Sequence, residues 1–299
     1  MECGRRVGEG PCRTSARPAR YLDRPAAGTR FGPVYASGLV VYPIKSAAGV
    51  PVAEWSLDPS GLRHDRSFMV VDTAGRYLTQ RECPRLALVR PTSVDGGWQV
   101  EVADQGSFTL PFRISDAPRT TVTVWEHTGP AFDAGDEAAE ALSALLDRPV
   151  RVVGLAPEHD RSADAGYGGD DVPVGFVDGF PVLLTADASL ADLNRRMPRP
   201  LPMTRFRPNL VVSGSAAWAE DRWSQVRVGD CLLELVKPCA RCAITTVDPD
   251  RGVRDGAEPL RTLGAFRRGD RGVLFGWNVL VRDAGVVRVG DPVSVVHPV

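Results

Sequence analysis

The sequence predicts a β-rich α+β fold with a β-barrel core and few helices. Short apolar runs with the alternation typical of strands recur along most of the chain, and turns rich in Gly and Pro separate them. Only two segments show clear helical periodicity, and strands and helices do not alternate as they do in a Rossmann fold. With 299 residues, the chain has room for one large domain or two smaller ones.

Order is expected to begin near Val34, and the first half of the chain has the pattern of a β-meander. We expect strands over residues 34–42, 52–57, 67–72, 86–90, 98–102 and 120–125. Turns rich in Gly, Pro and Asp separate several of them. Examples are residues 59–61 and the hairpin loop 72–75, which returns through residues 76–79.

Two segments have the apolar spacing of amphipathic helices, residues 135–146 and 187–197. Acidic residues at the start of the first segment suit the positive end of a helix dipole, and Pro149 separates it from a strand expected over residues 150–155. A Pro-Arg-Pro run stops the second segment. The apolar faces are expected to consist of Ala138, Leu142, Leu145 and Leu146 in the first helix, and of Leu190, Leu193 and Met197 in the second.

The second half is expected to be β-rich from Asn209 to the end. We expect short strands over residues 182–185, 231–236 and 243–247. A loop rich in Asp and Gly, residues 158–172, is the best candidate for a mobile segment or an internal boundary. The tetrapeptide Arg-Val-Gly-Asp occurs at 227–230 and at 288–291, each time between apolar runs, which predicts two tight turns that depend on glycine.

Composition limits the classes of function. The net charge of −1 gives no field that attracts nucleic acid, and no apolar run approaches the roughly 18 residues of a membrane span. The cysteine spacing does not resemble a secreted disulfide framework, so we expect a cytoplasmic protein that binds neither nucleic acid nor membrane. Residues 1–33 are rich in Arg, Gly and Pro without the apolar core of a signal peptide, which indicates a disordered tail or a start of translation placed too early.

A C-x-x-C pair, Cys239 and Cys242, lies between two apolar runs at a predicted turn. Arg241 and Lys237 are close in sequence, and cationic neighbours favour the thiolate, the form that binds metals and attacks electrophiles. The pair alone leaves four interpretations open. A structural zinc site needs a second pair of ligands, and a thioredoxin-like site needs the pair to open a helix. The other two are inert buried thiols and a single reactive or metal-binding cysteine.

Several cations stand at strand ends or in loops rich in Gly and Pro. Cations that converge from separate loops on one pocket bind a phosphate or another dianion through charge-assisted hydrogen bonds. The set consists of Lys45, Arg66, Arg205, Arg207 and Arg241.

Six stretches, taken in order, carry a family resemblance. They are residues 41–46 (Val-Tyr-Pro-Ile-Lys-Ser), 61–72, 78–88, 206–209 (Phe-Arg-Pro-Asn), 239–250 and 274–278 (Leu-Phe-Gly-Trp-Asn). Together they resemble MOSC-domain proteins, in particular the branch of mitochondrial amidoxime-reducing components and their bacterial counterparts, from about residue 34 to the C-terminus. The resemblance implies a MOSC-type β-barrel core over residues 156–299, preceded by an N-terminal β-barrel-like region over residues 34–155.

The resemblance also implies roles for single residues. Cys242 would be the molybdenum ligand and catalytic residue, while Cys239 would support that ligand or be structural. A thiolate suits such a metal, and the pterin dithiolene of the molybdenum cofactor (Mo-molybdopterin) would supply two further sulfurs. The positions that match contacts to the phosphate or pterin of the cofactor are Lys45, Ser46, Arg66, Asp178, Gly179, Phe180, Arg207, Asn209, Arg241 and Asn278.

The chemistry that the resemblance implies is two-electron reduction of small N-hydroxylated compounds, from N–OH to N–H. The chain contains no C-x4-C-x2-C run typical of a plant-type ferredoxin, so we expect electrons from a separate reductase or ferredoxin. Asp248 lies near Cys242 in sequence, but nothing in the sequence places it at the metal. Ala47 and Ala240 stand where relatives carry Cys and Ser, and neither is a predicted ligand.

Two other functions fit the same resemblance. MOSC domains also occur in cofactor sulfurases, so a thiolate at Cys242 would carry sulfur under the same electrostatics. The third function is a non-catalytic carrier of molybdenum cofactor. Pyridoxal phosphate binding is a further property associated with MOSC proteins.

Overall fold

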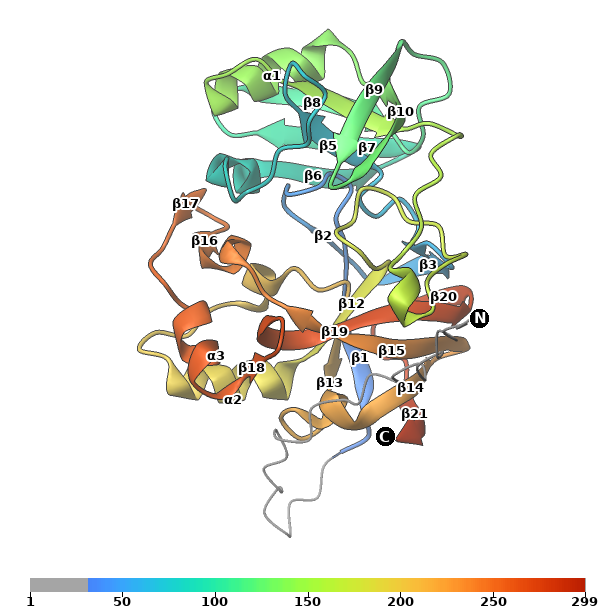
Figure 1. The fold of residues 1–299 in the computed structure, drawn as a ribbon, viewed down its shortest axis with the longest axis vertical. Coiled ribbons are helices and arrows are strands. Elements are labelled where there is room, and N and C mark those ends of the chain that lie inside the picture. Colours follow the sequence, from blue (N-terminus) through green and yellow to red (C-terminus); the bar gives the residue numbers. More distant parts are fainter. Residues whose placement is uncertain (1–31, 299) are drawn as a thin grey trace, which may run out of the picture.

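Strands dominate the molecule, which is arranged as two stacked halves (Figure 1). The computed structural model describes residues 32–298, so the tail predicted at residues 1–33 lies outside the described part except for its last two residues. The upper half in Figure 1 carries strands β5 to β10, and the lower half carries β12 to β15 with β19 and β21. The β-rich α+β class predicted from the sequence is confirmed.

One large sheet organises the lower half, and the first and last strands both belong to it. Its order is β2–β1–β13–β12–β19–β15–β14–β21, with β18 paired to β19. The strands are β1 (Tyr35–Val41), β2 (Val50–Val52), β12 (Val182–Ala186), β13 (Leu210–Ser213), β14 (Trp223–Val228), β15 (Cys231–Ala240), β18 (Arg268–Gly269), β19 (Gly272–Asp283) and β21 (Val293–Pro298). Because β1 pairs with β13, the segment that leads to Lys45 starts inside the sheet that carries Cys239.

Neighbouring strands of this sheet run antiparallel with one exception. β12 and β13 are parallel, and α2 (Asp187–Arg196) lies between them in sequence. The sequence predicted no βαβ rhythm, and this single unit is a departure from that prediction. Leu193 of α2 packs in a buried cluster with Phe206 and Phe275, which fixes the helix against the sheet.

The upper half contains two smaller sheets and one helix. Their orders are β5–β11–β10–β9 and β6–β7–β8. The elements are β5 (Phe68–Val71), β6 (Val89–Val94), β7 (Gly97–Val102), β8 (Gly106–Pro111), β9 (Arg119–Val124), β10 (His127–Asp133), α1 (Asp136–Leu146) and β11 (Arg151–Leu155). Leu142 and Leu145 of α1 are fully buried and share a hydrophobic cluster with Trp98.

Several short elements complete the described fold. One small sheet has the order β20–β3–β4, and a hairpin pairs β16 with β17. The remaining elements are β3 (Glu54–Asp58), β4 (Gly61–Leu62), β16 (Val247–Asp248), β17 (Val253–Arg254), β20 (Gly285–Arg288), α3 (Leu260–Phe266) and the 3₁₀ turns η1 (Pro84–Leu88), η2 (Ala165–Tyr167), η3 (Met203–Phe206), η4 (Ala219–Arg222) and η5 (Ala243–Thr246). β3 of the first half of the chain pairs with β20 near its end.

Several sequence predictions are confirmed. The two predicted helices are α1 and α2, and the strand predicted after Pro149 is β11. Both Arg-Val-Gly-Asp stretches form turns that use a left-handed glycine, with φ of +54° at Gly229 and +98° at Gly290. The Gly229 amide donates to the carbonyl of Pro292, so the two turns lie side by side.

Three predicted strands are wrong in whole or in part. Residues 243–246 form the turn η5 and only Val247 enters a strand, because the hydroxyls of Thr245 and Thr246 donate to the carbonyls of Cys242 and Ala243 and compete with strand pairing. Residues 84–88 form η1, with a proline at its first position. The run 52–57 splits between β2 and β3, which belong to different sheets. Helix α3 interrupts the region predicted to be β-rich to the end of the chain.

No helix within residues 32–298 combines the length and the apolar character that crossing a membrane requires.

Gly61 of β4 tests how closely the small sheet packs against the segment that precedes β12. It has a φ of +107°, and a Cβ there would lie 2.5 Å from the carbonyl oxygen of Pro181. We expect Gly61→Ala to lower the free energy of unfolding by about 1–3 kcal/mol, measured by urea denaturation. Gly96→Ala is the matched control, since Gly96 has a φ of +76° but nothing within 4 Å of its Cβ position. Equal losses in the two variants would contradict the close fit.

Glu220 of η4 predicts a pH dependence of stability. Its side chain is buried, Ser189 Oγ donates to Oε1 at 2.7 Å, and burial followed by the nearby Asp221 raises its pKa from 4.5 to about 7. The folded chain therefore holds a proton that the unfolded chain has lost, so this stabilisation is complete below pH 4.5 and disappears as the pH rises through 7. We expect a loss of about 3 kcal/mol between pH 5 and 8 in the wild type that is absent in Glu220→Gln. If the unfolding free energies of the wild type and Glu220→Gln change in parallel with pH, Glu220 is not the source of the pH dependence.

Candidate functional site

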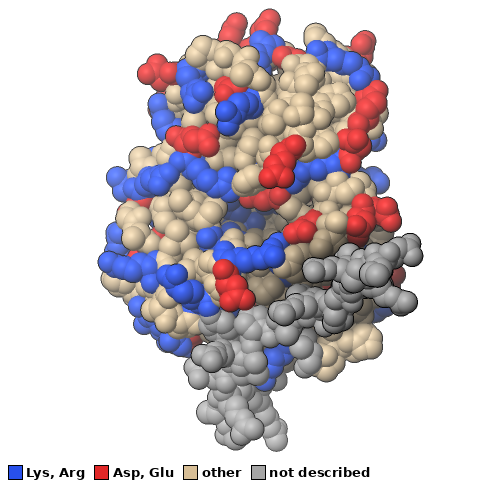
Figure 2. Space-filling model, viewed as in Figure 1, with Lys and Arg blue, Asp and Glu red and all other residues tan. Residues whose placement is uncertain are grey.

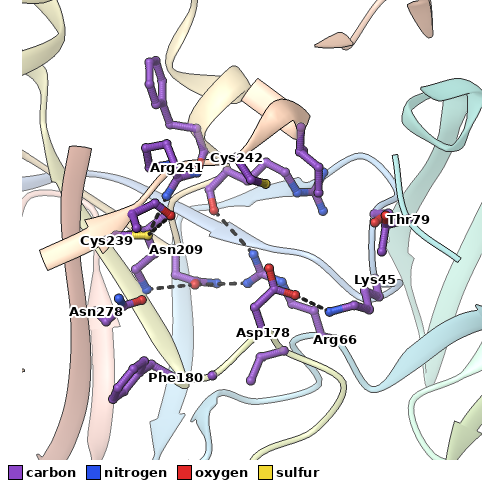
Figure 3. Close-up of a pocket in the computed structure, with 18 residues that line it drawn as sticks. Lys45, Arg66, Thr79, Asp178, Phe180, Asn209, Cys239, Arg241, Cys242 and Asn278 are labelled. Carbon is purple, nitrogen blue, oxygen red and sulfur yellow. Dashed lines mark hydrogen bonds and ion pairs between the residues drawn. The ribbon is translucent and has the colours of Figure 1, made fainter. Parts of the chain in front are cut away.

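A pocket opens at the junction of the two halves, and residues from both halves line it (Figure 3). The space between its walls, including the open mouth, is about 790 Å³. The eleven residues that the family resemblance assigned to the metal or cofactor all line this pocket: Lys45, Ser46, Arg66, Asp178, Gly179, Phe180, Arg207, Asn209, Arg241, Cys242 and Asn278. The sequence missed other lining residues, among them Thr79, Val177, Leu183, Phe206 and Ile244.

Positively charged side chains are prominent at the opening. In Figure 2, Lys and Arg side chains border the hollow between the upper and lower halves, with some Asp and Glu side chains beside them. Lys45, Arg66, Arg207 and Arg241 come from four separate segments and line the same pocket, as the convergence argument predicted. Arg205 does not join them, because it lines a separate cavity.

The backbone is strained at several of these positions. Eight non-glycine residues among residues 32–298 have a positive φ. Three of the eight line the pocket, namely Ser46 at +69°, Arg66 at +46° and Arg207 at +56°. Sparsely populated conformations cluster at ligand sites because the surrounding structure holds them.

Asp65 forms the buried centre of the wall. One of its oxygens accepts from the Tyr42 amide at 2.7 Å and from Asn209 Nδ2 at 3.0 Å, and the other accepts from the Arg66 guanidinium. Asn209 Oδ1 accepts from Arg66 at 3.1 Å and from the Leu183 amide at 3.2 Å. Burial raises the pKa of Asp65, although Arg66 opposes this. Arg66 and Asn209 therefore support the wall, beside any contact they make to a ligand.

Tyr42 brings two cations together. The guanidinium carbons of Arg66 and Arg207 lie 4.2 and 4.3 Å from the centre of its ring. Burial lowers the pKa of Arg207 to about 10, so this side chain stays charged at neutral pH. Its guanidinium donates to the Ala47 carbonyl at 2.5 Å, and among residues 32–298 no carboxylate forms an ion pair with it. Arg207 is thus a partly buried positive charge available to an anion.

Lys45 is held at the loop that contains Asp178. Its Nζ donates to Asp178 Oδ1 at 2.5 Å and to the Phe176 carbonyl at 2.8 Å. Burial lowers the pKa of Lys45, and Asp178 opposes that shift. Burial would raise the pKa of Asp178, but Lys45 and then Arg81 hold it well below its usual range. Asp178 is therefore a carboxylate at neutral pH and no proton donor.

Arg161 fixes the backbone of the same loop. Its guanidinium donates to the carbonyls of Gly175, Val177 and Asp178 at 2.7 to 2.9 Å. The loop thus presents Gly179 and Phe180 to the pocket in a defined position.

The two cysteines of the C-x-x-C pair have different surroundings. Cys239 is the second-last residue of β15. Its Sγ accepts a hydrogen bond from the Arg241 guanidinium at 2.8 Å (Figure 3). Arg241 also donates to the Phe206 carbonyl at 2.6 Å. Lys237 is paired with Asp164 at 2.9 Å. The two cations close to Cys242 in sequence therefore interact with other groups.

The cation that faces Cys242 is Arg81, which the sequence analysis did not select. Its guanidinium is close enough to Cys242 for the two side chains to interact electrostatically, and it lies 3.6 Å from the Asp178 carboxylate. Burial would lower the pKa of Arg81, but the charges of Cys242 and Asp178 raise it. Arg81 lies inside the stretch 78–88 that carried the family resemblance, so that motif was the available signal.

Among residues 32–298, no group of three or more His, Cys, Asp or Glu side chains is placed to hold a metal ion. A metal bound at Cys242 would need further ligands from outside the chain, as a dithiolene would provide. Asp248 does not line the pocket. It lies with Arg205 at the separate cavity, where the Arg205 guanidinium is 3.6 Å from Asp248 and 3.1 Å from Asp255.

Comparison with known proteins identifies the family. Residues 34–149 match the MOSC N-terminal beta barrel domain, and residues 171–294 match the MOSC domain. The chain therefore belongs to the MOSC-domain family, in the group that includes the amidoxime-reducing components. Mitochondrial amidoxime-reducing component 1 of Mus musculus is 35% identical over 93% of this chain and 85% of its own length. The Homo sapiens protein of the same name is 35% identical over 85% of this chain and 81% of its own.

Likeness among solved structures is weaker. The YuaD protein of Bacillus subtilis aligns with 88% of this chain and 96% of its own at 10% identity, with a TM-score of 0.39. That score is too low to support an inference.

The ion pair of Asp65 with Arg66 tests the construction of the wall. We expect Arg66→Ala to cost about 3–5 kcal/mol of unfolding free energy, because it leaves a buried carboxylate without its cation. Asp65→Asn removes that charge, so Arg66→Ala made in the Asp65→Asn background should cost much less. A double-mutant cycle measured by urea denaturation gives the coupling. Additive losses would show that the pair does not support the wall.

Proposed function

We propose that the chain binds molybdenum cofactor and reduces small N-hydroxylated compounds to the corresponding N–H compounds. The observation that carries the proposal is the convergence of four cations and Cys242 on one pocket. The names of the relatives, amidoxime-reducing components, agree with this reaction. An anionic pterin phosphate needs a cationic, hydrogen-bonding cradle, and a soft metal needs a thiolate.

The residues present fit such a group. Arg207 is a partly buried cation whose guanidinium donates to the Ala47 carbonyl, and an anion would complete its surroundings. Arg241 has a buried Nε without a hydrogen-bond partner. Cys242 precedes η5 and its side chain caps no backbone group there, which leaves the thiol free for a ligand. Lys45, Ser46 and Arg207 would hold the anionic part, and Cys242 would ligate the metal.

When bound, the cofactor would supply the two-electron reduction, and the balance is N–OH + 2 e⁻ + 2 H⁺ → N–H + H₂O. Arg81 faces Cys242 and would orient the polar N–OH group there. Phe180, Phe206 and Ile244 provide the apolar part of the wall that limits water. Asp178 stays ionised under the influence of Lys45 and Arg81, so the protons enter from solvent or from another group.

The partners follow from the same proposal. Electrons come from a separate reductase or ferredoxin, and the substrate is a small molecule. The cytoplasmic location expected from the sequence stays a prediction.

Cys242→Ser tests the assignment of the ligand. In protein made by a host that synthesises molybdenum cofactor, we expect the variant to lose bound molybdenum. Its reduction of an aromatic amidoxime with dithionite should fall more than about 100-fold, since even outer-shell changes at metal sites cost 10–100-fold. Cys83→Ser is the matched control, because Cys83 is half-buried and does not line the pocket.

The outcomes separate the three functions. Full molybdenum and activity in Cys242→Ser would show that the ligand is assigned wrongly. A sulfane sulfur on Cys242 without molybdenum would favour sulfur transfer. Protein that binds molybdenum but reduces no amidoxime would favour a carrier.

A further inference from the structure

An exposed indole stands beside the pocket in an unusual backbone conformation. Trp125 is 41% exposed and lies in the two-residue turn between β9 and β10, where Val124 pairs with His127. Its φ is +55°, a region that bulky residues rarely adopt and that Gly, Asn or Asp normally occupies in such turns. The strain indicates that the position of this side chain serves something other than folding.

Contacts anchor the indole to the rim of the pocket. Its ring centre lies 5.4 Å from that of Tyr77, at an angle of 45°. The guanidinium carbon of Arg81 lies 5.0 Å from the Trp125 ring, and Lys45 Nζ lies 5.9 Å from it. Lys45 itself lines the pocket. Trp125 is thus fixed at the edge of the site.

Arg81 connects the indole to the pocket. Its guanidinium contacts the Trp125 ring, lies 3.6 Å from the Asp178 carboxylate that lines the pocket, and is close enough to Cys242 for an electrostatic interaction. A ligand whose polar group reaches Cys242 along Arg81 would therefore bring the rest of its structure beside Trp125. The polar group of such a ligand would lie near Cys242, and a planar remainder would lie against the Trp125 ring.

The positive charges at the rim determine which planar ligands bind there. An aromatic face binds other π-systems by stacking, and Trp offers the largest such face. Lys45 and Arg81 repel a cation at the same place. Amidoximes and similar N-hydroxylated compounds are uncharged at neutral pH, whereas the amidines formed from them are cations. The rim therefore favours substrate over product.

We propose that Trp125, with Tyr77 and Arg81, forms a platform that selects flat, uncharged, aromatic N-hydroxylated substrates. The proposal rests on the proposed function, because it names the substrate class of that site. Trp125 is a specificity residue that contacts the substrate away from the reacting bond, and its turn presets the indole before the substrate arrives.

The kinetic test compares two amidoximes that differ in their bodies, benzamidoxime and acetamidoxime. In cofactor-loaded protein we expect Trp125→Leu to raise KM for benzamidoxime roughly tenfold, with kcat and the constants for acetamidoxime changed less than about twofold. Trp125→Phe should retain most of the preference. Glu126→Ala is the matched control for the turn, since Glu126 is the exposed neighbour of the indole. A loss that is equal for both substrates would overturn the platform.

The binding test does not depend on turnover. Benzamide and benzamidinium share a ring and differ in charge, and their affinities are measured by calorimetry with the full chain and with the same variants. We expect the wild type to bind benzamide more tightly than benzamidinium, and Trp125→Leu to weaken benzamide by roughly tenfold. Equal affinities of the wild type and Trp125→Leu for benzamide would overturn the platform.

The two tests separate the two failures. If the wild type reduces neither amidoxime, the proposed function fails, and the benzamide titration still decides whether the platform exists. If the wild type reduces both and Trp125→Leu shifts neither constant, the platform fails and the proposed function stands.

Discussion

The buried carboxylate of Asp65 is the interaction on which the rest of the pocket depends. Through Tyr42, Arg66 and Asn209 it joins the end of β1, the segment before β5 and the start of β13. Asn209 extends the network to Leu183 of β12. A buried charge is costly unless its partners are in place, so this network holds the segments in one arrangement.

The charges of the pocket are only partly balanced within the chain. Arg66 is compensated by Asp65, and Lys45 by Asp178, whereas Arg207 contacts a carbonyl and the ring of Tyr42. The pocket therefore keeps a positive charge in a region of low dielectric, where an anion gains more than it would in water. Local backbone strain at Arg66 and Arg207 is held by the same network.

The sequence predicted the members of the pocket better than their contacts. Ordered motifs identified all eleven selected residues as neighbours of one cofactor, and all of them line one pocket. Their functional roles stay predictions. Proximity in sequence did not predict which cation lies beside Cys242. Arg241 donates a hydrogen bond to Cys239, and Lys237 forms an ion pair with Asp164. Arg81 reaches Cys242 across the junction of the halves, and that pairing has no local signal.

Local propensity also misled in specific places. The run 243–247 has strand-forming residues, yet hydrogen bonds from two threonine hydroxyls favour the turn η5 over residues 243–246, and Cys242 directly precedes that turn. The sequence could not identify Trp125 as a candidate site residue either. The features that single it out are an uncommon φ and contacts to Tyr77 and Arg81, which lie in another part of the chain. Such features follow from tertiary packing, which overrides local preference.

The most direct test of the central claim is the molybdenum and pterin content of the wild-type chain, purified from a host that makes molybdenum cofactor. We expect roughly one molybdenum and one pterin per chain, because Cys242 and the four cations line one pocket. Protein that folds and contains neither would contradict it.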